Sequence, residues 1–130
     1  MKNFLKTKKG RIKGQAYYRN RICFCSMGLQ ALTAGRLKIN QIEAGRKVLA
    51  RTIKKTGKIL VRIKPNTPIT KKPIEVRMGN GKGEIKEKIY KIKPGNIIYE
   101  INYINTLIAQ RCLKKAAMKL PIKTITITNI

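Results

Sequence analysis

The stretch NQIEAGRKVLARTIKKTGKILVRIK, residues Asn40–Lys64, predicts a helix followed at once by a strand. Asn40, with Glu43 three residues later, resembles a capping box at the start of a helix. Apolar and small residues then recur at helical spacing until Gly57, which provides a C-terminal stop. The next residues, KILVRIK, alternate between apolar and polar, which is typical of a half-buried strand. Because both periods occur within one short stretch, it favours a mixed α and β domain.

The rest of the chain predicts more strands and one more helix. Prolines at 65, 68 and 73 indicate a loop after the first strand. A helix at Thr106–Lys119 begins after the capping residue Asn105 and ends before Pro121. Strands are expected within 17–32 and at Ile74–Met78, Glu84–Lys93 with a bulge after Ile89, Ile97–Tyr103 and Lys123–Thr128.

These elements predict one α+β domain over residues 1–130, with a mainly antiparallel sheet and two helices. Residues 1–21 are expected to form an extended basic arm. They belong to a longer acid-free segment that runs to Lys38 and contains four glycines.

The charge of the chain is extreme: 31 Lys plus Arg face 5 Asp plus Glu, giving a formal net charge of +26 in 130 residues. With 42% hydrophobic residues, the chain can still bury a core. So many positive charges repel one another in a compact fold, so we expect a polyanion, most simply a nucleic acid, as partner.

Composition also excludes much chemistry. The chain has no His and no Asp, so a general acid/base pair or an activated nucleophile is hard to build. The three cysteines, Cys23, Cys25 and Cys112, are too few for a structural zinc site, and we expect neither metal, cofactor nor disulfide. No apolar run is long enough for a membrane span, so no membrane partner is expected.

Two basic runs near the N-terminus, KTKKGRIK at 6–13 and RNR at 19–21, flank Tyr17 and Tyr18. Interleaved cations and aromatic rings suit looped or single-stranded RNA, although a solvated, disordered segment is the alternative. The polar face of the first helix carries further cations at 46, 47, 51, 54 and 55, a stripe expected to face phosphate. Tyr90, Tyr99 and Tyr103 lie in expected strands and are assigned to the core or to a sheet face, with stacking platforms for bases as the alternative.

The glycine-rich stretch GNGKG at 79–83 fits neither a P-loop nor a dinucleotide-binding fingerprint, because its spacing differs and no helix follows. It is expected as a turn between strands. The flanking Arg77 and Lys82, with glycines that let backbone amides approach closely, favour contact with phosphate. A flexible hairpin tip without a ligand is the alternative.

Four segments together resemble the ribosomal protein L-sixteen family, which is related to the L-ten-e proteins. In order they are GRLKINQIEAGRKVLARTIKKTGKILVRI at 35–63, TPITKKPIEVRMGNGKG at 67–83, IKPGNIIYEI at 92–101 and LKKAAMKLPIKT at 113–124. The resemblance covers roughly residues 8–128. It implies an α/β-hammerhead fold, no catalytic residue, and a structural role in the large ribosomal subunit as an rRNA-binding protein that joins late in assembly.

The resemblance also implies partners and sites: large-subunit rRNA, A-site tRNA near the peptidyl-transferase region, and neighbouring ribosomal proteins. Gly10 and Gly14 match its basic arm. Taken with the basic runs and the helix face, the expected rRNA-binding residues are Lys6, Lys8, Lys9, Arg11, Lys13, Arg19, Arg21, Arg36, Arg46, Arg51, Lys54 and Lys55. The loop expected next to tRNA is Arg77, Met78, Gly79, Asn80, Gly81, Lys82 and Gly83.

This sequence departs from the family pattern in places. The arm begins later than in usual bacterial members, Asn80 stands where the loop often has Lys, and residues 17–25 differ from common bacterial versions. Lys and Ile dominate in a way that suggests AT-rich codons. We therefore expect a protein made inside a mitochondrion without a removable presequence, with a plastid or an AT-rich bacterium as alternatives. An RNA-processing enzyme using Glu84 or Glu87 and a cationic membrane-surface protein are rival functions.

Overall fold

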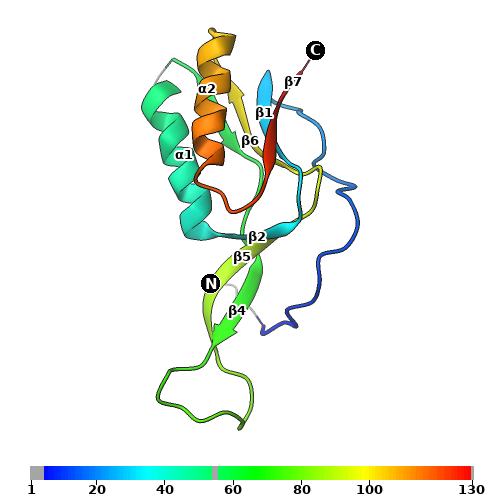
Figure 1. Ribbon diagram of the computed structural model, residues 1–130, viewed down its shortest axis with the longest axis vertical. Helices are drawn as coiled ribbons and strands as arrows, with labels where there is room; N and C mark the ends of the chain where they lie inside the picture. Colours follow the sequence, from blue (N-terminus) through cyan, green and yellow to red (C-terminus); the bar gives the residue numbers. More distant parts are fainter. Residues whose placement is uncertain (1–4, 54–55, 130) are drawn as a thin grey trace.

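A computed structural model describes residues 5–53 and 56–129, and its body is a four-stranded antiparallel sheet with two helices on one face (Figure 1). The strand order is β3 (Lys58–Val61), β6 (Ile97–Asn102), β1 (Met27–Ala31) and β7 (Thr124–Thr128). Helices α1 (Ile39–Ile53) and α2 (Thr106–Ala117) lie side by side against it. The predicted α+β class with antiparallel pairing is confirmed.

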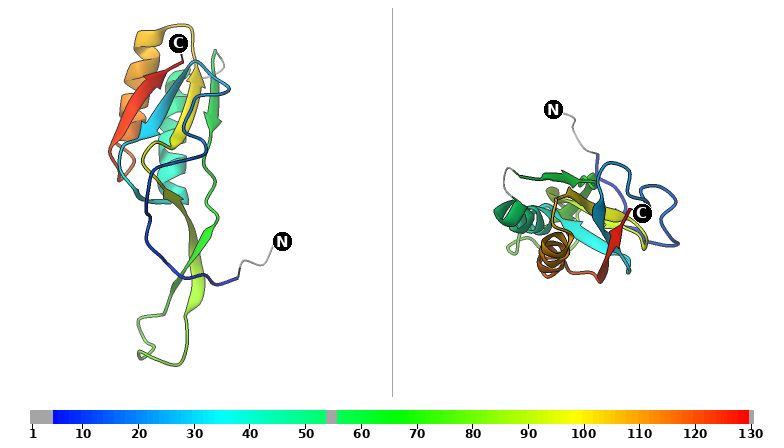
Figure 2. Two further views of the ribbon diagram at one scale, coloured as in Figure 1. Left: turned by 90° about the vertical axis from the view of Figure 1, so that its right-hand side faces the viewer. Right: turned by 90° about the horizontal axis from the view of Figure 1, so that it is seen from above.

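A second sheet projects from one end of this body. It contains β2 (Gly35–Lys38), β5 (Glu84–Ile92) and β4 (Thr67–Lys71), with β5 in the centre. The β4–β5 hairpin and its loop, residues 72–83, give the molecule its elongated shape (Figure 2). The expectation of one main sheet is therefore corrected to two, because β2, β4 and β5 pair only with one another.

The main core lies between the four-stranded sheet and the helices. Tyr99 on β6 is fully buried, and its hydroxyl donates to the carbonyl oxygen of Ile42 in α1, at 2.7 Å. Gly45 makes room for the ring, since a Cβ atom there would lie 2.3 Å from the Tyr99 hydroxyl. Tyr90 and Tyr103 pack against the same core, so the assignment of these three tyrosines is confirmed.

The predicted strand Ile74–Met78 is wrong, because these residues lie in the loop between β4 and β5. The hairpin partner of β5 is instead β4, a segment whose prolines predict a loop. Pro68 is tolerated there because β4 is an edge strand with only one neighbour. The irregularity in β5 faces Ile69 and Thr70 of β4, instead of following Ile89 as expected.

The helix ends differ from the sequence pattern in two places: the start of α1, and the end of α2, which lies at Ala117 instead of Lys119. The N-cap of α2 is confirmed: the Asn105 side chain accepts from the backbone N–H groups of Leu107 and Ile108, at 3.1 and 3.3 Å. Helix α1 instead begins at Ile39, so Asn40 is not its cap. Thr56 and Gly57 follow the described end of α1, and a Cβ atom on Gly57 would lie 2.5 Å from the Asn102 carbonyl oxygen.

Residues 5–26 form neither helix nor strand; the segment begins beside the β4–β5 hairpin and then runs along the four-stranded sheet on the side away from the helices (Figure 2). They are tied down at several points, for example where Arg36 donates to the Gly10 carbonyl oxygen at 2.9 Å. The longer acid-free segment is not all extended arm, since it contains β1 and β2. An arm over residues 1–21 stays a prediction.

Candidate nucleic-acid interface

Acidic groups in this chain hold its own elements together, and Glu100 is the strongest case. Its carboxylate is fully buried and ion-paired with Arg62. It also accepts the backbone N–H groups of Cys23, Phe24 and Cys25, at 3.2, 2.9 and 3.2 Å. Burial opposes its ionisation, but these donors outweigh that effect and lower the pKa of Glu100. No local sequence pattern indicates this site, because its donors lie 38 or more residues from Glu100.

Two more acids pair with cations. Glu87 of β5 lies 3.2 Å from the ammonium group of Lys38, and Glu43 pairs with Arg46 one turn along α1. The Arg46 hydrogen bond lowers the pKa of Glu43. Arg46, an expected rRNA contact, is therefore partly neutralised inside its own helix, which the i, i+3 spacing could have indicated.

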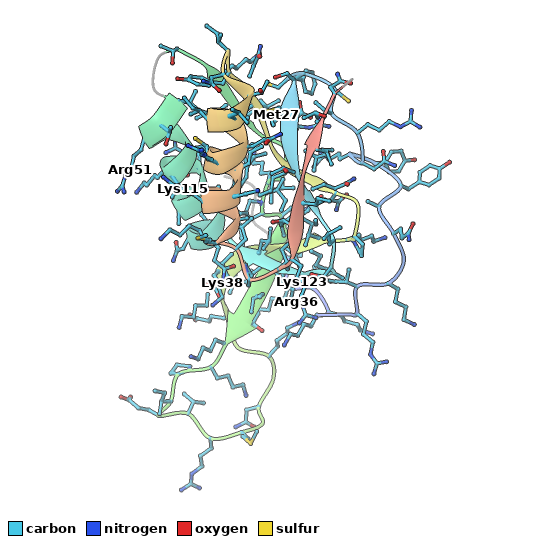
Figure 3. All side chains as sticks on the ribbon, turned by 45° about the horizontal axis from the view of Figure 1, so that its top comes forward. Met27, Arg36, Lys38, Arg51, Lys115 and Lys123 are labelled. Carbon is cyan, nitrogen blue, oxygen red and sulfur yellow. The ribbon has the colours of Figure 1, made fainter. Side chains whose placement is uncertain are left out.

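The outer faces of the helices remain cationic. Lys47 and Arg51 of α1 are exposed, as are Arg111, Lys114 and Lys115 of α2. Figure 3 shows Arg51 and Lys115 on the neighbouring helices. The expected residues Lys54 and Lys55 lie outside the described residues. The α2 cations were absent from the expected set, although their position on the polar face of an amphipathic helix could have included them.

A second cationic region lies where the hairpin leaves the body. Figure 3 labels Arg36 and Lys38 of β2 and Lys123, which lies just before β7, near this junction, where Lys38 is paired with Glu87. Arg36 is half-buried, and its Nε is a buried donor without a partner among the described residues. Sequence reasoning missed Lys123 because only the tertiary fold brings it to β2.

The loop at the hairpin tip is almost entirely exposed, including the apolar side chains of Ile74 and Met78, which are 97% and 101% exposed. Three consecutive residues have left-handed backbone: Gly79 at φ 103°, Asn80 at φ 59° and Gly81 at φ 91°. A Cβ atom on Gly79 or Gly81 would have no neighbouring atom within 4 Å, so there is room for a side chain at both positions. Glycine is favoured there because of the left-handed backbone conformation.

The base of this loop meets the N-terminal segment. Lys82 donates to the Thr7 carbonyl oxygen at 2.5 Å, and Lys6 donates to the Lys82 carbonyl oxygen at 3.3 Å. Lys72 donates to the Gly79 carbonyl oxygen across the loop. Arg77 at the tip is exposed. The structure thus brings Lys6 and Lys82, from two expected sites, to one place.

The remaining expected cations lie along the N-terminal segment and are exposed. Arg19 donates to the Arg62 carbonyl oxygen at 3.4 Å. The others are Lys8, Lys9, Arg11, Lys13 and Arg21.

The cysteines do not gather. Cys23 is exposed, Cys25 and Cys112 are buried, and all three are free thiols. Across residues 5–53 and 56–129, no three potential metal ligands of the His, Cys, Asp and Glu types come together. Within the same ranges, neither helix has the length and apolar character that a membrane span needs.

These features define a small, strongly cationic α+β domain with a projecting hairpin and cations on several faces. Comparison with known proteins identifies its family. The sequence profile of the family described as Ribosomal protein L16p/L10e matches residues 1–127, and the chain belongs to that family. The resemblance inferred from the sequence is confirmed. Because this is a family of ribosomal proteins, the chain is not an enzyme.

Individual relatives support the same assignment. The chain is 46% identical to "Large ribosomal subunit protein uL16" of Acinetobacter baylyi over 126 residues, which cover 97% of this chain and 92% of that protein. It is also 46% identical to the protein of that name from Francisella tularensis subsp. holarctica over 121 residues, or 93% and 88% of the two chains. Both organisms are bacteria, so these relatives do not support a mitochondrial location.

Proposed function

We propose that the chain is a structural constituent of the large ribosomal subunit that binds large-subunit rRNA and helps to position A-site tRNA near the peptidyl-transferase region. One observation carries this proposal: in a member of a ribosomal protein family, exposed cations cover the helices, the hairpin junction and the N-terminal segment. An RNA that wraps the protein would contact all three regions. Neighbouring ribosomal proteins are the expected protein partners.

In this proposal, rRNA contacts the two helices and the N-terminal segment. Lys47, Arg51 and Lys115 offer charges without a carboxylate partner among the residues described, whereas Arg46 is paired with Glu43. The N-terminal segment adds cations on the face opposite the helices. Phosphate contact by Lys and Arg releases counterions, so affinity would fall steeply as salt rises.

The hairpin loop is the part proposed to lie next to tRNA. It extends beyond both sheets, and its Arg77, Met78 and Lys82 side chains are exposed. A loop at the end of a two-stranded arm can reach a ligand that the body does not contact. Asn80 already has the left-handed φ that Asn adopts more easily than most residues, so it fits the tip in place of Lys.

Sedimentation tests the ribosomal assignment. In a sucrose gradient of native extract at low salt, we expect mass spectrometry to find this chain with the large subunit and the monosome. A chain found only at the top of the gradient would contradict the proposal. For the purified chain, log–log plots of rRNA affinity against salt should have a slope of about −0.7 to −0.9 for each phosphate contact.

Substitution of Arg77 by Ala tests the role of the loop. We expect Arg77→Ala to reduce A-site tRNA accommodation more than incorporation into the subunit. The matched comparison is Arg111→Ala, which removes the same charge from the exposed face of α2 and, since that face is proposed to contact rRNA, should reduce incorporation more than tRNA accommodation. If incorporation fails first, Arg77 is an rRNA anchor and the proposed role of the loop is wrong.

The compartment is a separate part of the proposal. The Lys- and Ile-rich composition favours an organelle, and the bacterial relatives favour a bacterial cytoplasm. Fractionation of the source cells, followed by detection of the chain in the ribosomes of each fraction, distinguishes these locations.

A further inference from the structure

The segment that carries Tyr17 and Tyr18 is held firmly to the turn between β5 and β6. The backbone N–H of Ala16 donates to the Pro94 carbonyl oxygen at 2.9 Å. Three residues later, the Arg19 carbonyl oxygen accepts from the N–H of Ile97 at 2.8 Å. The two tyrosines therefore lie between fixed backbone contacts.

Two amide side chains reinforce this attachment. Asn96 is 6% exposed, and its amide orientation is assigned from its surroundings: with the nitrogen towards the Tyr18 carbonyl oxygen and the oxygen towards the Lys93 N–H, it donates to the first and accepts from the second, both at 3.1 Å. Gln30 donates to the carbonyl oxygens of Gly95 and Asn20, at 2.8 and 3.3 Å. A buried polar group needs such partners, so these contacts fix the segment's position.

The rings themselves are left in solvent. Tyr17 is 84% exposed and Tyr18 79% exposed, with ring centroids 5.2 Å apart in an edge-to-face arrangement. The next residue, Arg19, has a left-handed φ of 59°, a conformation that L-residues other than Asn and Asp rarely adopt. A fixed backbone with bare aromatic rings adds little to folding, whereas rigid aromatic side chains suit a binding surface.

Cations surround the tyrosine pair. Tyr17 and Tyr18 line an open depression of about 740 Å³, together with Tyr90 and the basic residues Arg19, Lys91 and Lys93. No ion pair is formed by these three basic residues within the described part of the chain. Aromatic faces with neighbouring positive charge match a nucleotide, whose base stacks and whose phosphate is anionic.

We infer that Tyr17 and Tyr18 form a stacking site for an unpaired RNA base, with Arg19, Lys91 and Lys93 contacting the adjacent phosphates. This inference rests on the proposed RNA-binding function and names a mode of recognition within it. In an RNA duplex the bases are stacked on one another, so the ligand is a loop, a bulge or a single strand.

Binding by paired variants of the full chain tests the site. The probe is a labelled single-stranded RNA, compared with a duplex RNA of the same length by fluorescence anisotropy. We expect the double variant Tyr17→Ala/Tyr18→Ala to bind the single strand about tenfold or more weakly, because stacking on aromatic side chains is lost. Its duplex binding and the slope of its salt dependence should match those of the natural chain, because the cations remain.

Two controls separate stacking from other effects. Tyr17→Phe/Tyr18→Phe keeps the rings and should bind the single strand within about twofold of the natural chain. Ile104→Ala/Leu107→Ala removes exposed apolar side chains elsewhere and should have no effect. The inference would be overturned if the Ala double variant lost equal affinity for single strand and duplex, or lost no affinity at all. It would also be overturned if the Phe double variant lost as much affinity as the Ala double variant. Failure of the natural chain to bind RNA would instead contradict the proposed function.

Crosslinking gives a readout that needs no variant. Trypsin releases both tyrosines in one short peptide, residues 14–19. In subunits that contain 4-thiouridine RNA and this chain, ultraviolet light should attach RNA to that peptide. Repeating the experiment with 4-thiouridine only in the rRNA or only in A-site tRNA identifies the source of the base. Absence of the crosslink with both RNAs would overturn the inference.

Discussion

Replacing Glu100 by Gln is expected to lower the free energy of unfolding by about 3 kcal/mol. One carboxylate oxygen accepts from Phe24 and Cys25, and the other accepts from Cys23 and Arg62. Gln keeps the shape but replaces one oxygen with an N–H donor, so two of these four donors lose their acceptor. Glu100 is 0% exposed, so water cannot replace it.

Urea unfolding of the full chain at pH 7, followed by far-UV circular dichroism, measures this loss. The midpoint of thermal unfolding should fall by about 10 °C in a domain of this size. Glu84→Gln is the matched control, because it makes the same change of charge at an exposed position on β5 and should cost under about 0.5 kcal/mol. Equal destabilisation by the two substitutions would refute the structural role of Glu100.

The pH dependence gives a second test. The pKa of Glu100 is lower in the folded chain than in the unfolded chain, where a Glu carboxyl has a pKa of about 4.3. Its contribution is therefore complete above about pH 5 and is lost as pH falls through the lower folded pKa. The difference in stability between the natural chain and Glu100→Gln should shrink over that acidic range. A difference that stayed constant to low pH would show that the charge is not its cause.

Three further predictions follow from burial and pairing. Arg51→Gln should reduce the slope of log rRNA affinity against log salt concentration by about one. Arg46→Gln should reduce this slope less, because Glu43 already offsets the charge of Arg46. Filter binding over a series of salt concentrations compares the two variants. Leu113→Ala, at a fully buried position of α2, should lower the free energy of unfolding by about 2–5 kcal/mol. Leu107 is 65% exposed, so Leu107→Ala should lower it by under about 0.5 kcal/mol. Urea unfolding measures both values. The exposed thiol of Cys23 should react faster with a thiol reagent at pH 8 than the buried thiols of Cys25 and Cys112. Burial and the Glu100 charge also raise the pKa of Cys25, which slows its reaction further. Equal reaction rates for the three thiols would contradict this prediction.

Local sequence patterns predicted the elements whose residues carry their own signal. Helix α2 has an apolar stripe and a capping Asn105, and β6 and β7 have residues with high strand propensity. Strand β4 was missed because Pro68 normally indicates a loop, and only its edge position makes it acceptable. Strand β2 was not predicted, because its four residues before α1 are too few to show a clear alternation of apolar and polar residues. The division into two sheets depends on non-local pairing, which no local pattern contains.

The basic residues of the candidate interface could be predicted from the sequence. Which of them are free of carboxylate partners, and so can contact phosphate, could not be fully predicted. Composition identifies many Lys and Arg residues, and the i, i+3 spacing can indicate the pairing of Arg46 with Glu43, but only the fold shows that Arg62 is paired with Glu100. In the same way, the sequence indicated that Tyr17 and Tyr18 lie among cations. The buried Asn96 that holds their backbone is more than seventy residues away in the chain, so its role follows only from tertiary structure.

Three of the five acids hold elements of the chain itself together. Glu43 pairs within α1, Glu87 joins β5 to the end of β2, and Glu100 fixes residues 23–25 to β6. Acids used in this way fix elements in place and leave most of the net charge of +26 facing outward. Mutual repulsion of these cations opposes the compact state, and a polyanion that neutralises them favours it. If the chain binds RNA as proposed, folding and RNA binding are thermodynamically linked, because an anion that binds only the folded chain also stabilises it.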